Sequence, residues 1–280
     1  MDRYEKIFSV SARGAALVGR QVGREGAGET GVVETINAEG AGPVVLACEH
    51  ASNVIPAEFT DLGLGAEALE SHIAWDPGAR AVALRLSALL DAPLVAQHVS
   101  RLVYDCNRPP HAADATPAQS ETYTIPGNAG LTAEERTRRA KFYYEPFRTA
   151  LAACLDARLA GTGAPALVTI HSFTPVYFGM PRDVGLGILH DRDRRLADAL
   201  LASLAGESGW IVRRNEPYGP EDGVTHTLAD QALPRGIDNV MIEIRNDLIA
   251  DTAGQEKVAR LLGRHLQKAL AAPAGEMVAK

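Results

Sequence analysis

The sequence predicts an α/β protein, a three-layer sandwich in which a mostly parallel mixed sheet carries helices on both faces. Short runs rich in Val, Ile and Leu alternate with longer segments of helical periodicity, and polar residues directly follow several of the apolar runs. A strand, a helix and a second strand in succession normally form a right-handed crossover, which makes the two strands parallel. The alternation therefore predicts parallel strands with helices packed on either side.

The elements can be placed one after another from residue 43 onwards. The apolar run PVVLAC opens the series as a strand, and GARAVALRLSALL follows it as a helix. The expected strands are 43–48, 93–99, 165–173, 184–191, 209–215 and 238–245. The expected helices are 78–90, 131–160, 193–205 and 252–270.

The longest expected helix, 131–160, has a marked start and an internal proline. Thr132 stands three residues before Glu135, the spacing of a capping box in which each side chain bonds the other residue's backbone N–H. Pro146 lacks a backbone N–H and its ring crowds the preceding turn, so we expect a kink midway along this helix.

The chain is expected to hold one domain preceded by a short extension. Residues 1–42 are rich in Gly and Glu around GREGAGETG and are expected to form a loosely held leader or an arm packed on the domain. Residues 43–280 contain no internal repeat and no evident linker, which favours a single α/β domain. Residues 106–130 hold four prolines and no periodicity. A loop of this length is usually functional, often a lid.

The charge pattern argues against nucleic acid as a partner. The 280 residues include 28 Lys and Arg against 35 Asp and Glu, a net charge of −7, and the basic residues form no stripe. No apolar stretch is long enough to span a membrane and no secretion signal is evident, so we expect no membrane contact and a cytoplasmic location. Cys48, Cys106 and Cys154 match no zinc or disulfide spacing and are expected to be buried, reduced thiols.

Polar residues at the ends of two expected strands suggest a metal site. The strand 43–48 is followed by Glu49 and His50, and the strand 165–170 by His171. Ligands collect beyond the carboxyl ends of parallel strands, and a catalytic zinc takes three protein ligands, often imidazoles with a carboxylate. His50 and His171 are the expected first pair. Asp76 is the preferred third ligand, with His72 and Glu49 as alternatives, and either histidine alone would more often be a structural residue.

A buried strand also carries a carboxylate, Glu243, in VMIEIRNDL. An ionised carboxylate in a buried strand costs several kcal/mol unless it is paired or borders a cavity. One interpretation pairs Glu243 with Arg245, two residues on and on the same strand face, which would keep the acid ionised. The other makes Glu243 the general base that moves protons during a hydrolysis. The two interpretations are compatible.

The segment SRLVYDCNRPP contributes Arg101, Asp105, Asn107 and Arg108. Arginines bind carboxylates with two parallel hydrogen bonds, so this segment is expected to bind an acidic substrate. The structural alternative is an ion pair of Asp105 with one of the two arginines, which would only fix the following loop. His226, after a Gly-containing loop, is a further candidate for the mouth of the site.

Six ordered motifs resemble the N-formylglutamate amidohydrolase family: ACEHASNVIP, HIAWDPGA, SRLVYDCNRPP, YTIPGNAGLTAEER, TIHSFTP and IEIRNDL. The resemblance spans about residues 43 to 270. It implies a zinc-dependent hydrolase of phosphorylase/hydrolase-like fold, related to zinc carboxypeptidases and muramoyl-alanine amidases. The family's two histidines fall on His50 and His171, and its late acid falls on Glu243. Its arginine-rich motif falls on Arg101, Asn107 and Arg108.

The combined expectation is a metal-dependent amidohydrolase. Zinc held by His50, Asp76 and His171 activates water, while Glu243 moves protons. Arg101, Arg108 and Arg245 hold the carboxylates of an N-acyl amino acid such as N-formylglutamate, a substrate class that implies a place in histidine degradation. CEHASN and HIAWDPGA depart from the motifs of the better-known deformylases and indicate a divergent branch. The alternatives are an amidase or carboxypeptidase acting on peptidoglycan-like peptides, and a binding protein without catalysis. Oligomers are compatible with the sequence.

Overall fold

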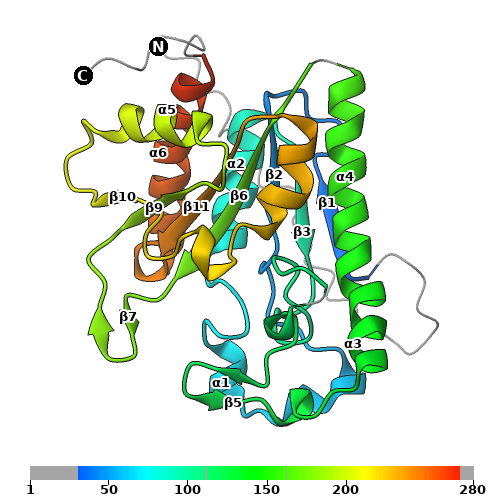
Figure 1. Ribbon diagram of the computed structural model, residues 1–280. Coiled ribbons are helices and arrows are strands. Elements are labelled where there is room, and N and C mark those ends of the chain that lie inside the picture. The colour runs from blue at the N-terminus through cyan, green and yellow to red at the C-terminus, as the bar shows by residue number, and fades with distance from the viewer. Residues whose placement is uncertain (1–30, 111, 162, 272–280) are drawn as a thin grey trace, which may run out of the picture.

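The computed structural model describes residues 31–110, 112–161 and 163–271, and within them a seven-stranded sheet in the order β1-β3-β2-β6-β11-β9-β10 (Figure 1). The strands are β1 (Val33–Ile36), β2 (Val44–Cys48), β3 (Leu94–Gln97), β6 (Ala166–Phe173), β9 (Leu186–Leu189), β10 (Val212–Arg214) and β11 (Asn239–Arg245). The central four, β3, β2, β6 and β11, run parallel. β1 is antiparallel to β3 and β9 to β11, which confirms the predicted mixed, mostly parallel sheet.

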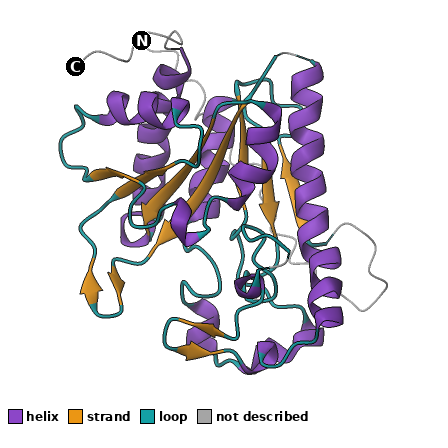
Figure 2. Ribbon diagram, in the orientation of Figure 1, coloured by secondary structure: helices purple, strands orange, loops and turns teal. Residues whose placement is uncertain are grey.

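Helices cover both faces of this sheet, as Figure 2 shows. α2 (Ala79–Leu90), α5 (Arg195–Leu204) and α6 (Thr252–Ala271) pack on one face. The opposite face packs against α4 (Glu145–Ala160) and against the chain around residues 62–74, 99–106 and 224–237. The three-layer arrangement expected from the alternation of strands and helices is therefore confirmed. None of the described helices is long and apolar enough to cross a membrane.

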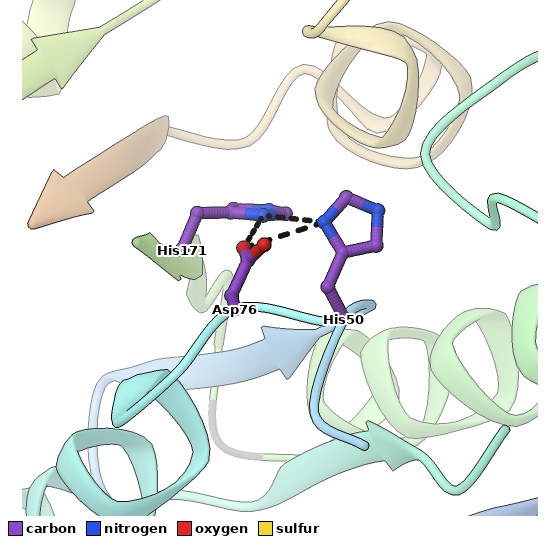
Figure 3. A group of neighbouring side chains, drawn as sticks. All are labelled: His50, Asp76 and His171. Carbon is purple, nitrogen blue, oxygen red and sulfur yellow. Dashed lines mark hydrogen bonds and ion pairs between the residues drawn. The ribbon is translucent and has the colours of Figure 1, made fainter. Parts of the chain in front are cut away.

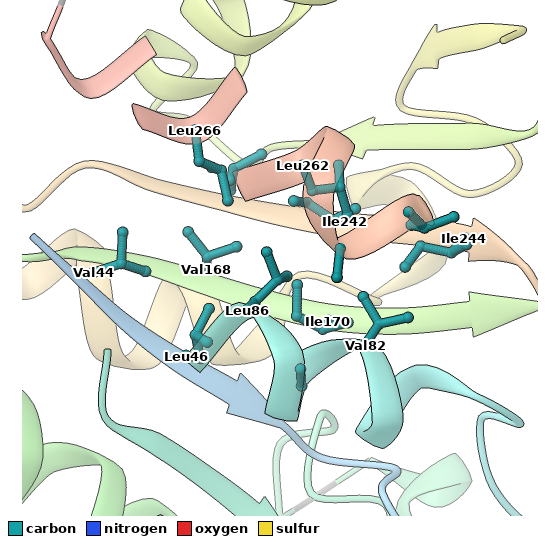
Figure 4. Close-up of a cluster of buried hydrophobic side chains, with 14 of the residues drawn as sticks. Val44, Leu46, Val82, Leu86, Val168, Ile170, Ile242, Ile244, Leu262 and Leu266 are labelled. Atoms are coloured by element: carbon teal, nitrogen blue, oxygen red, sulfur yellow. The ribbon is translucent and has the colours of Figure 1, made fainter. Parts of the chain in front are cut away.

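Strand alternation divides the buried residues into two cores. On one face, Val168 and Ile170 of β6 and Ile242 of β11 join side chains of α2 and α6 (Figure 4). On the other face, Leu167 of β6 and Met241 of β11 join the second core. Successive side chains of a strand point to opposite faces, so this second face also receives the side chains of His171 and Glu243. This face also carries Thr169 midway along β6 and Asn239 at the start of β11, whereas its histidine and its glutamate lie near the carboxyl edge.

The expected helix 131–160 is one continuous helical segment with a widened turn. α3 (Ala133–Arg139) begins at Thr132 with the predicted capping box, and α4 continues to Ala160. Between them a π-helical turn spans Ala140–Tyr144, where the N–H of Glu145 reaches the carbonyl of Ala140. Pro146 lies directly after this turn at the start of α4, where its missing N–H and bulky ring disturb the regular ladder. In place of the kink expected at Pro146, the helix has a π-helical turn just before the proline.

The sequence analysis missed the first strand. β1 lies within the segment assigned to a leader or arm and pairs with β3 at the edge of the sheet. Residues 1–30 of that segment lie outside the described residues, so the division at residue 42 stays a prediction. The loop 106–130 contains the short strands β4 (Gln119–Ser120) and β5 (Tyr123–Thr124). The three cysteines are free thiols, as expected. Cys48 and Cys106 are buried, but Cys154 is only half-buried, so the burial expected for it is wrong.

Candidate metal centre at the carboxyl edge of the sheet

Three neighbouring parallel strands bring polar side chains to one place. Glu243 of β11 is paired in register with His171 of β6. Ala47 of β2 is paired with Thr169 of β6, so the same register carried two residues further sets Glu49 beside His171. Glu49, His171 and Glu243 therefore follow one another across three strands. This confirms that the strand ends converge, as the rule for parallel sheets predicts.

His50, Asp76 and His171 point toward one another in this cluster (Figure 3). The Nδ1 atoms of the two imidazoles lie 3.3 Å apart. Oδ2 of Asp76 lies 3.3 Å from Nδ1 of His50 and 2.9 Å from Nδ1 of His171. Ligand atoms about 2.0–2.1 Å from a tetrahedral zinc are about 3.3 Å from each other. The three donors, all buried, are therefore close to the spacing that one zinc ion requires, with the 2.9 Å separation of Asp76 and His171 somewhat shorter.

Local structure explains why Asp76 can reach the two histidines. The N–H of Asp76 donates to the carbonyl of His50 at 3.0 Å, which ties the segment before α2 to the end of β2. The N–H of Ser172 donates to Oδ2 of Asp76 at 3.2 Å. Gly78, at φ +81°, then turns the chain into α2 in a conformation that only glycine adopts without strain. The motif HIAWDPGA thus positions a carboxylate against both neighbouring strands.

Each imidazole presents its other ring nitrogen to a second acid. Nε2 of His50 lies 2.7 Å from Oδ1 of Asp105, and Nε2 of His171 lies 3.1 Å from Oε2 of Glu49. The first contact has hydrogen-bond geometry, whereas the second is a close ion pair that is not aligned for a hydrogen bond. An acid at Nε2 favours the proton there and leaves Nδ1 as the metal donor. Both rings are therefore oriented with Nδ1 toward the shared point.

The charges in the cluster stabilise one another. Burial alone would raise the pKa of Asp76, but the charge of His50 and the hydrogen bond with His171 outweigh burial and hold that pKa well below its usual value. Burial lowers the pKa of His171, but Glu49 and Asp76 reverse this effect and raise it. Asp76 is therefore an ionised carboxylate, the form that binds a cation. The donor set of two imidazoles and one carboxylate fits zinc.

Glu243 is the acid of the cluster without an ion pair among the described residues. Burial raises its pKa to about 7, and the charges of the neighbouring histidines oppose this only in part. The expected pairing with Arg245 is wrong. The chain turns after β11, and Arg245 binds Asp247 at 2.8 Å and the carbonyls of Arg182 and Asp183. A carboxyl with a pKa near neutrality can both accept and return a proton.

A cavity of about 510 Å³ opens above the cluster. His50, Asp76, His171 and Glu243 lie on its wall, together with Arg101, Asn107 and Arg108 of the predicted substrate-binding set. Arg245 is not part of the lining. Ser120 and Glu121, from the loop 106–130, also border the cavity, which supports the expectation that this loop is functional.

The arginines of the predicted substrate site already hold protein groups. Arg101 donates to Oδ2 of Asp105 at 2.7 Å and lies 3.5 Å from Oδ1 of Asp76. Arg108 pairs with Asp114 at 2.7 Å and donates to the carbonyl of Gly223. The ion pair of Arg101 with Asp105, considered as a structural alternative, is thus present. This ion pair also bears on the cluster, because the same carboxylate of Asp105 contacts Nε2 of His50.

The remaining candidates lie away from the shared donor point. His72 lines the cavity but faces Glu121 at 3.1 Å, and Glu49 contacts the far side of His171. Of the three candidates for the third ligand, only Asp76 has a carboxylate oxygen close to the Nδ1 atoms of both His50 and His171. His226 bonds the hydroxyl of Tyr144 at 2.7 Å and does not line the cavity. Asn107 lines it, but its amide is bound to the backbone at Val224 and Thr227.

Arg182 and Tyr218 are among the cavity residues that were not singled out from the sequence. Arg182 donates to the hydroxyl of Tyr218 at 3.0 Å. Tyr218 is close enough to Glu243 for that acid, after burial, to raise the tyrosine pKa to about 12. Neither residue lies in a strand or helix of recognisable period, so the pattern of the sequence carried no signal for them.

A gene product of Agrobacterium tumefaciens of known crystal structure is 54% identical, with a TM-score of 0.84, over 86% of this chain and 96% of that chain. The crystal structure of N-formylglutamate amidohydrolase from Ralstonia eutropha has a TM-score of 0.59 at 22% identity, over 86% of this chain and 97% of that chain. The second likeness shows a shared fold. No match is found among curated proteins.

The fold and the cluster together define an α/β protein of the enzyme type, with a polar cavity and a candidate metal centre at the carboxyl edge of a parallel sheet. The sequence profile of the N-formylglutamate amidohydrolase family matches residues 42–250. The chain belongs to this amidohydrolase family, which confirms the resemblance drawn from the six motifs.

Proposed function

We propose that the protein is a zinc-dependent hydrolase that cleaves the amide bond of an N-acyl amino acid such as N-formylglutamate, with formate and glutamate as products. The single observation that carries the proposal is the convergence of two Nδ1 atoms and a carboxylate oxygen at separations of 2.9–3.3 Å inside the cavity. Membership of an amidohydrolase family supports the reaction class.

In the proposed site His50, Asp76 and His171 hold the zinc. When bound, zinc supplies a Lewis acid that polarises the acyl carbonyl and makes water more acidic. Asp105 and Glu49 keep the two imidazoles oriented, since each acid contacts an Nε2 atom. Arg101 joins Asp76 to Asp105 and so keeps both carboxylates in place.

Glu243 is the proposed general base and acid. Its carboxylate takes a proton from the attacking water as the new C–O bond forms, and it then delivers that proton to the leaving nitrogen as the C–N bond breaks. Water is thus divided between the two products, and the carboxylate returns to its starting state. A pKa raised by burial to about 7 suits both transfers at neutral pH.

Arg101 and Arg108 are proposed to bind substrate carboxylates through the donors that their protein partners leave free. Asn107 supports them by holding the backbone at residues 224–227. Arg245 is proposed not to touch the substrate but to hold the backbone of Arg182 and Asp183, whose carbonyls accept hydrogen bonds from its guanidinium. Zinc as the native metal, the cytoplasmic location and a place in histidine degradation stay predictions.

The test combines metal analysis with formate release. Protein purified without chelator is analysed for bound metals and assayed against N-formyl derivatives of glutamate, aspartate, glutamine and alanine, with N-acetylglutamate to test the acyl group. The proposal expects about one zinc per chain and the fastest release from an acidic N-formyl amino acid. Turnover of muropeptides instead would favour the peptidoglycan amidase. Tight binding without zinc or turnover would favour a binding protein.

A further inference from the structure

Arg182 is the arginine of the cavity that has no acidic partner among the described residues. The other two, Arg101 and Arg108, are each paired with carboxylates. The side chain of Arg182 donates hydrogen bonds through Nη1 to the hydroxyl of Tyr218 at 3.0 Å and to the carbonyl of Thr174 at 3.4 Å. In the described part of the chain, Nε and Nη2 therefore keep their donors available. A buried or half-buried guanidinium with unused donors is suited to an anionic ligand.

The guanidinium is held among aromatic rings. Its carbon lies 4.3 Å from the ring centre of Tyr177, 4.9 Å from that of Tyr218 and 5.7 Å from that of Phe173. All three rings line the same cavity as Arg182. Aromatic faces attract the cation without forming directional bonds to its N–H groups. The rings thus restrain the guanidinium and leave the N–H groups of its Nε and Nη2 available to a ligand.

The backbone of Arg182 is also fixed. β7 (Val176–Tyr177) and β8 (Met180–Pro181) form a hairpin that extends from the carboxyl end of β6 (Figure 1), and the N–H of Arg182 closes it on the carbonyl of Pro175 at 2.8 Å. The carbonyl of Arg182 accepts a hydrogen bond from Arg245 at 3.0 Å. These two hydrogen bonds restrain the backbone at Arg182 without a ligand, which would reduce the entropy lost on binding.

We propose that Arg182 is the main carboxylate anchor of the substrate site, with Tyr177, Tyr218 and Phe173 as the rings that position it. The inference rests on the proposed function for the substrate class, an N-acyl amino acid. It assigns the tightest carboxylate contact to a residue of the β7–β8 hairpin rather than to the arginines of SRLVYDCNRPP, whose charges are compensated within the protein.

The test measures equilibrium binding in a background that cannot turn the ligand over. Glu243→Gln protein, loaded with zinc, is titrated calorimetrically with N-formyl-L-glutamate, and the same titration is made after adding Arg182→Gln, Arg182→Lys or Arg213→Gln. Removing the anchor is expected to weaken binding about 10- to 100-fold, since hydrogen bonds to charged groups contribute that much. The lysine variant keeps the charge without the fork and should lose less. Arg213, a β10 residue outside the cavity, is the matched control and should change nothing.

Two neutral analogues distinguish an anchor from a general structural effect. N-formyl-L-glutamine lacks the charge of the side-chain carboxylate, and the α-amide of N-formyl-L-glutamate lacks the charge of the α-carboxylate. If Arg182 binds one carboxylate, Arg182→Gln should cause no further loss with the analogue that lacks that group. Equal losses with the acid and both amides, unchanged affinity for the acid, or no binding to the parent variant would each overturn the anchor.

The outcome is separable from that of the proposed function. Absence of formate release from the wild-type protein, with the predicted binding pattern intact, would remove the hydrolase proposal and leave the anchor standing. Formate release by the wild type, with normal binding in Arg182→Gln, would do the reverse.

Discussion

Nδ1 of His50 lies 3.3 Å from Nδ1 of His171, too close for two N–H groups to face each other without repulsion. The two rings meet nearly edge to face, with 72° between their planes, so both nitrogens are directed toward the carboxylate of Asp76. A cation between the three donors removes the conflict between the two imidazoles. The first prediction follows from this relationship.

Replacement of His171 by Ala should abolish stoichiometric zinc binding, because one of three donors is lost and the shared point becomes incomplete. Zinc content after dialysis should fall from about one ion per chain to a trace, and formate release should fall by more than about 100-fold. His265→Ala is the control, since His265 is equally buried but bonded to Ser203 and Glu207. Full activity in zinc-replete His171→Ala protein would end the metal proposal.

Neutralising the acids behind the imidazoles should weaken metal binding without removing it. Glu49→Gln and Asp105→Asn are each expected to reduce zinc affinity about 10- to 100-fold, measured by competition with a chromophoric chelator. Glu34→Gln is a matched control, because Glu34 holds the imidazole of His98 at 2.9 Å in the same way but far from the cluster. Unchanged zinc affinity in both site variants would show that the Nε2 contacts do not orient the ligands.

Glu243→Gln should separate proton transfer from metal binding. The amide keeps the shape of the carboxyl group but cannot accept a proton, so kcat is expected to fall about 100- to 10,000-fold. Zinc content should stay at the wild-type level, since Glu243 is not one of the three converging donors. Loss of zinc together with activity would instead make Glu243 part of the metal site.

The same variant makes a prediction about stability against pH in zinc-free protein. Burial raises the pKa of Glu243 from about 4.5 to about 7, so the folded state binds more protons than the unfolded state between these values. The free energy of unfolding of the wild type therefore falls as the pH rises from about 4.5 to about 7, because the buried carboxyl group loses its proton. The Glu243→Gln variant has no proton to lose at this position and should not show this fall. Urea unfolding with a chelator should find the variant more stable than the wild type by about 1–3 kcal/mol at pH 8, with a smaller difference at pH 5. A difference independent of pH would contradict the raised pKa.

Gly78→Ala tests the turn that carries Asp76. A Cβ at this position would stand 2.6 Å from the carbonyl oxygen of Ile249, in addition to the strain of a positive φ. Gly130→Ala is a matched control, because Gly130 has φ +69° but no atom within 4 Å of a Cβ. Gly78→Ala should be less stable than the control by about 2 kcal/mol and should bind zinc more weakly. Equal effects of the two substitutions would mean that the turn tolerates displacement.

The fold was predictable because its signals are local. Apolar runs and helical periodicity indicate which residues of a segment are buried. They place β2, β6, β11 and the main helices within a few residues of their observed bounds. β1 was missed because it has only four residues at the edge of the sheet, three half-buried and one exposed, and so shows no clear apolar pattern. The convergence of His50 and His171 was predictable for a related reason, since strand ends in a parallel sheet converge by geometry.

The contacts that lie outside these patterns depend on the path of the chain in space. Asp105 and Glu49 gain their significance from the ring nitrogens that they meet, which no spacing reveals. Arg245 was assigned to Glu243 by strand alternation, but the turn after β11 brings it to Asp247 instead. Arg182 belongs to a hairpin of two-residue strands, too short to show a period.

The pairing of Glu243 with His171 in adjacent strands has a consequence for the evolution of the molecule. The separation of Glu243, the proposed proton carrier, from His171, a proposed metal ligand, is set by main-chain hydrogen bonds between the neighbouring strands β6 and β11. Such hydrogen bonds change little when surface segments change. The residues proposed to bind the substrate, including Arg108 and Arg182, come from loops and a hairpin around the cavity. Relatives can therefore exchange these peripheral segments and acquire new specificities while the reacting centre keeps its dimensions.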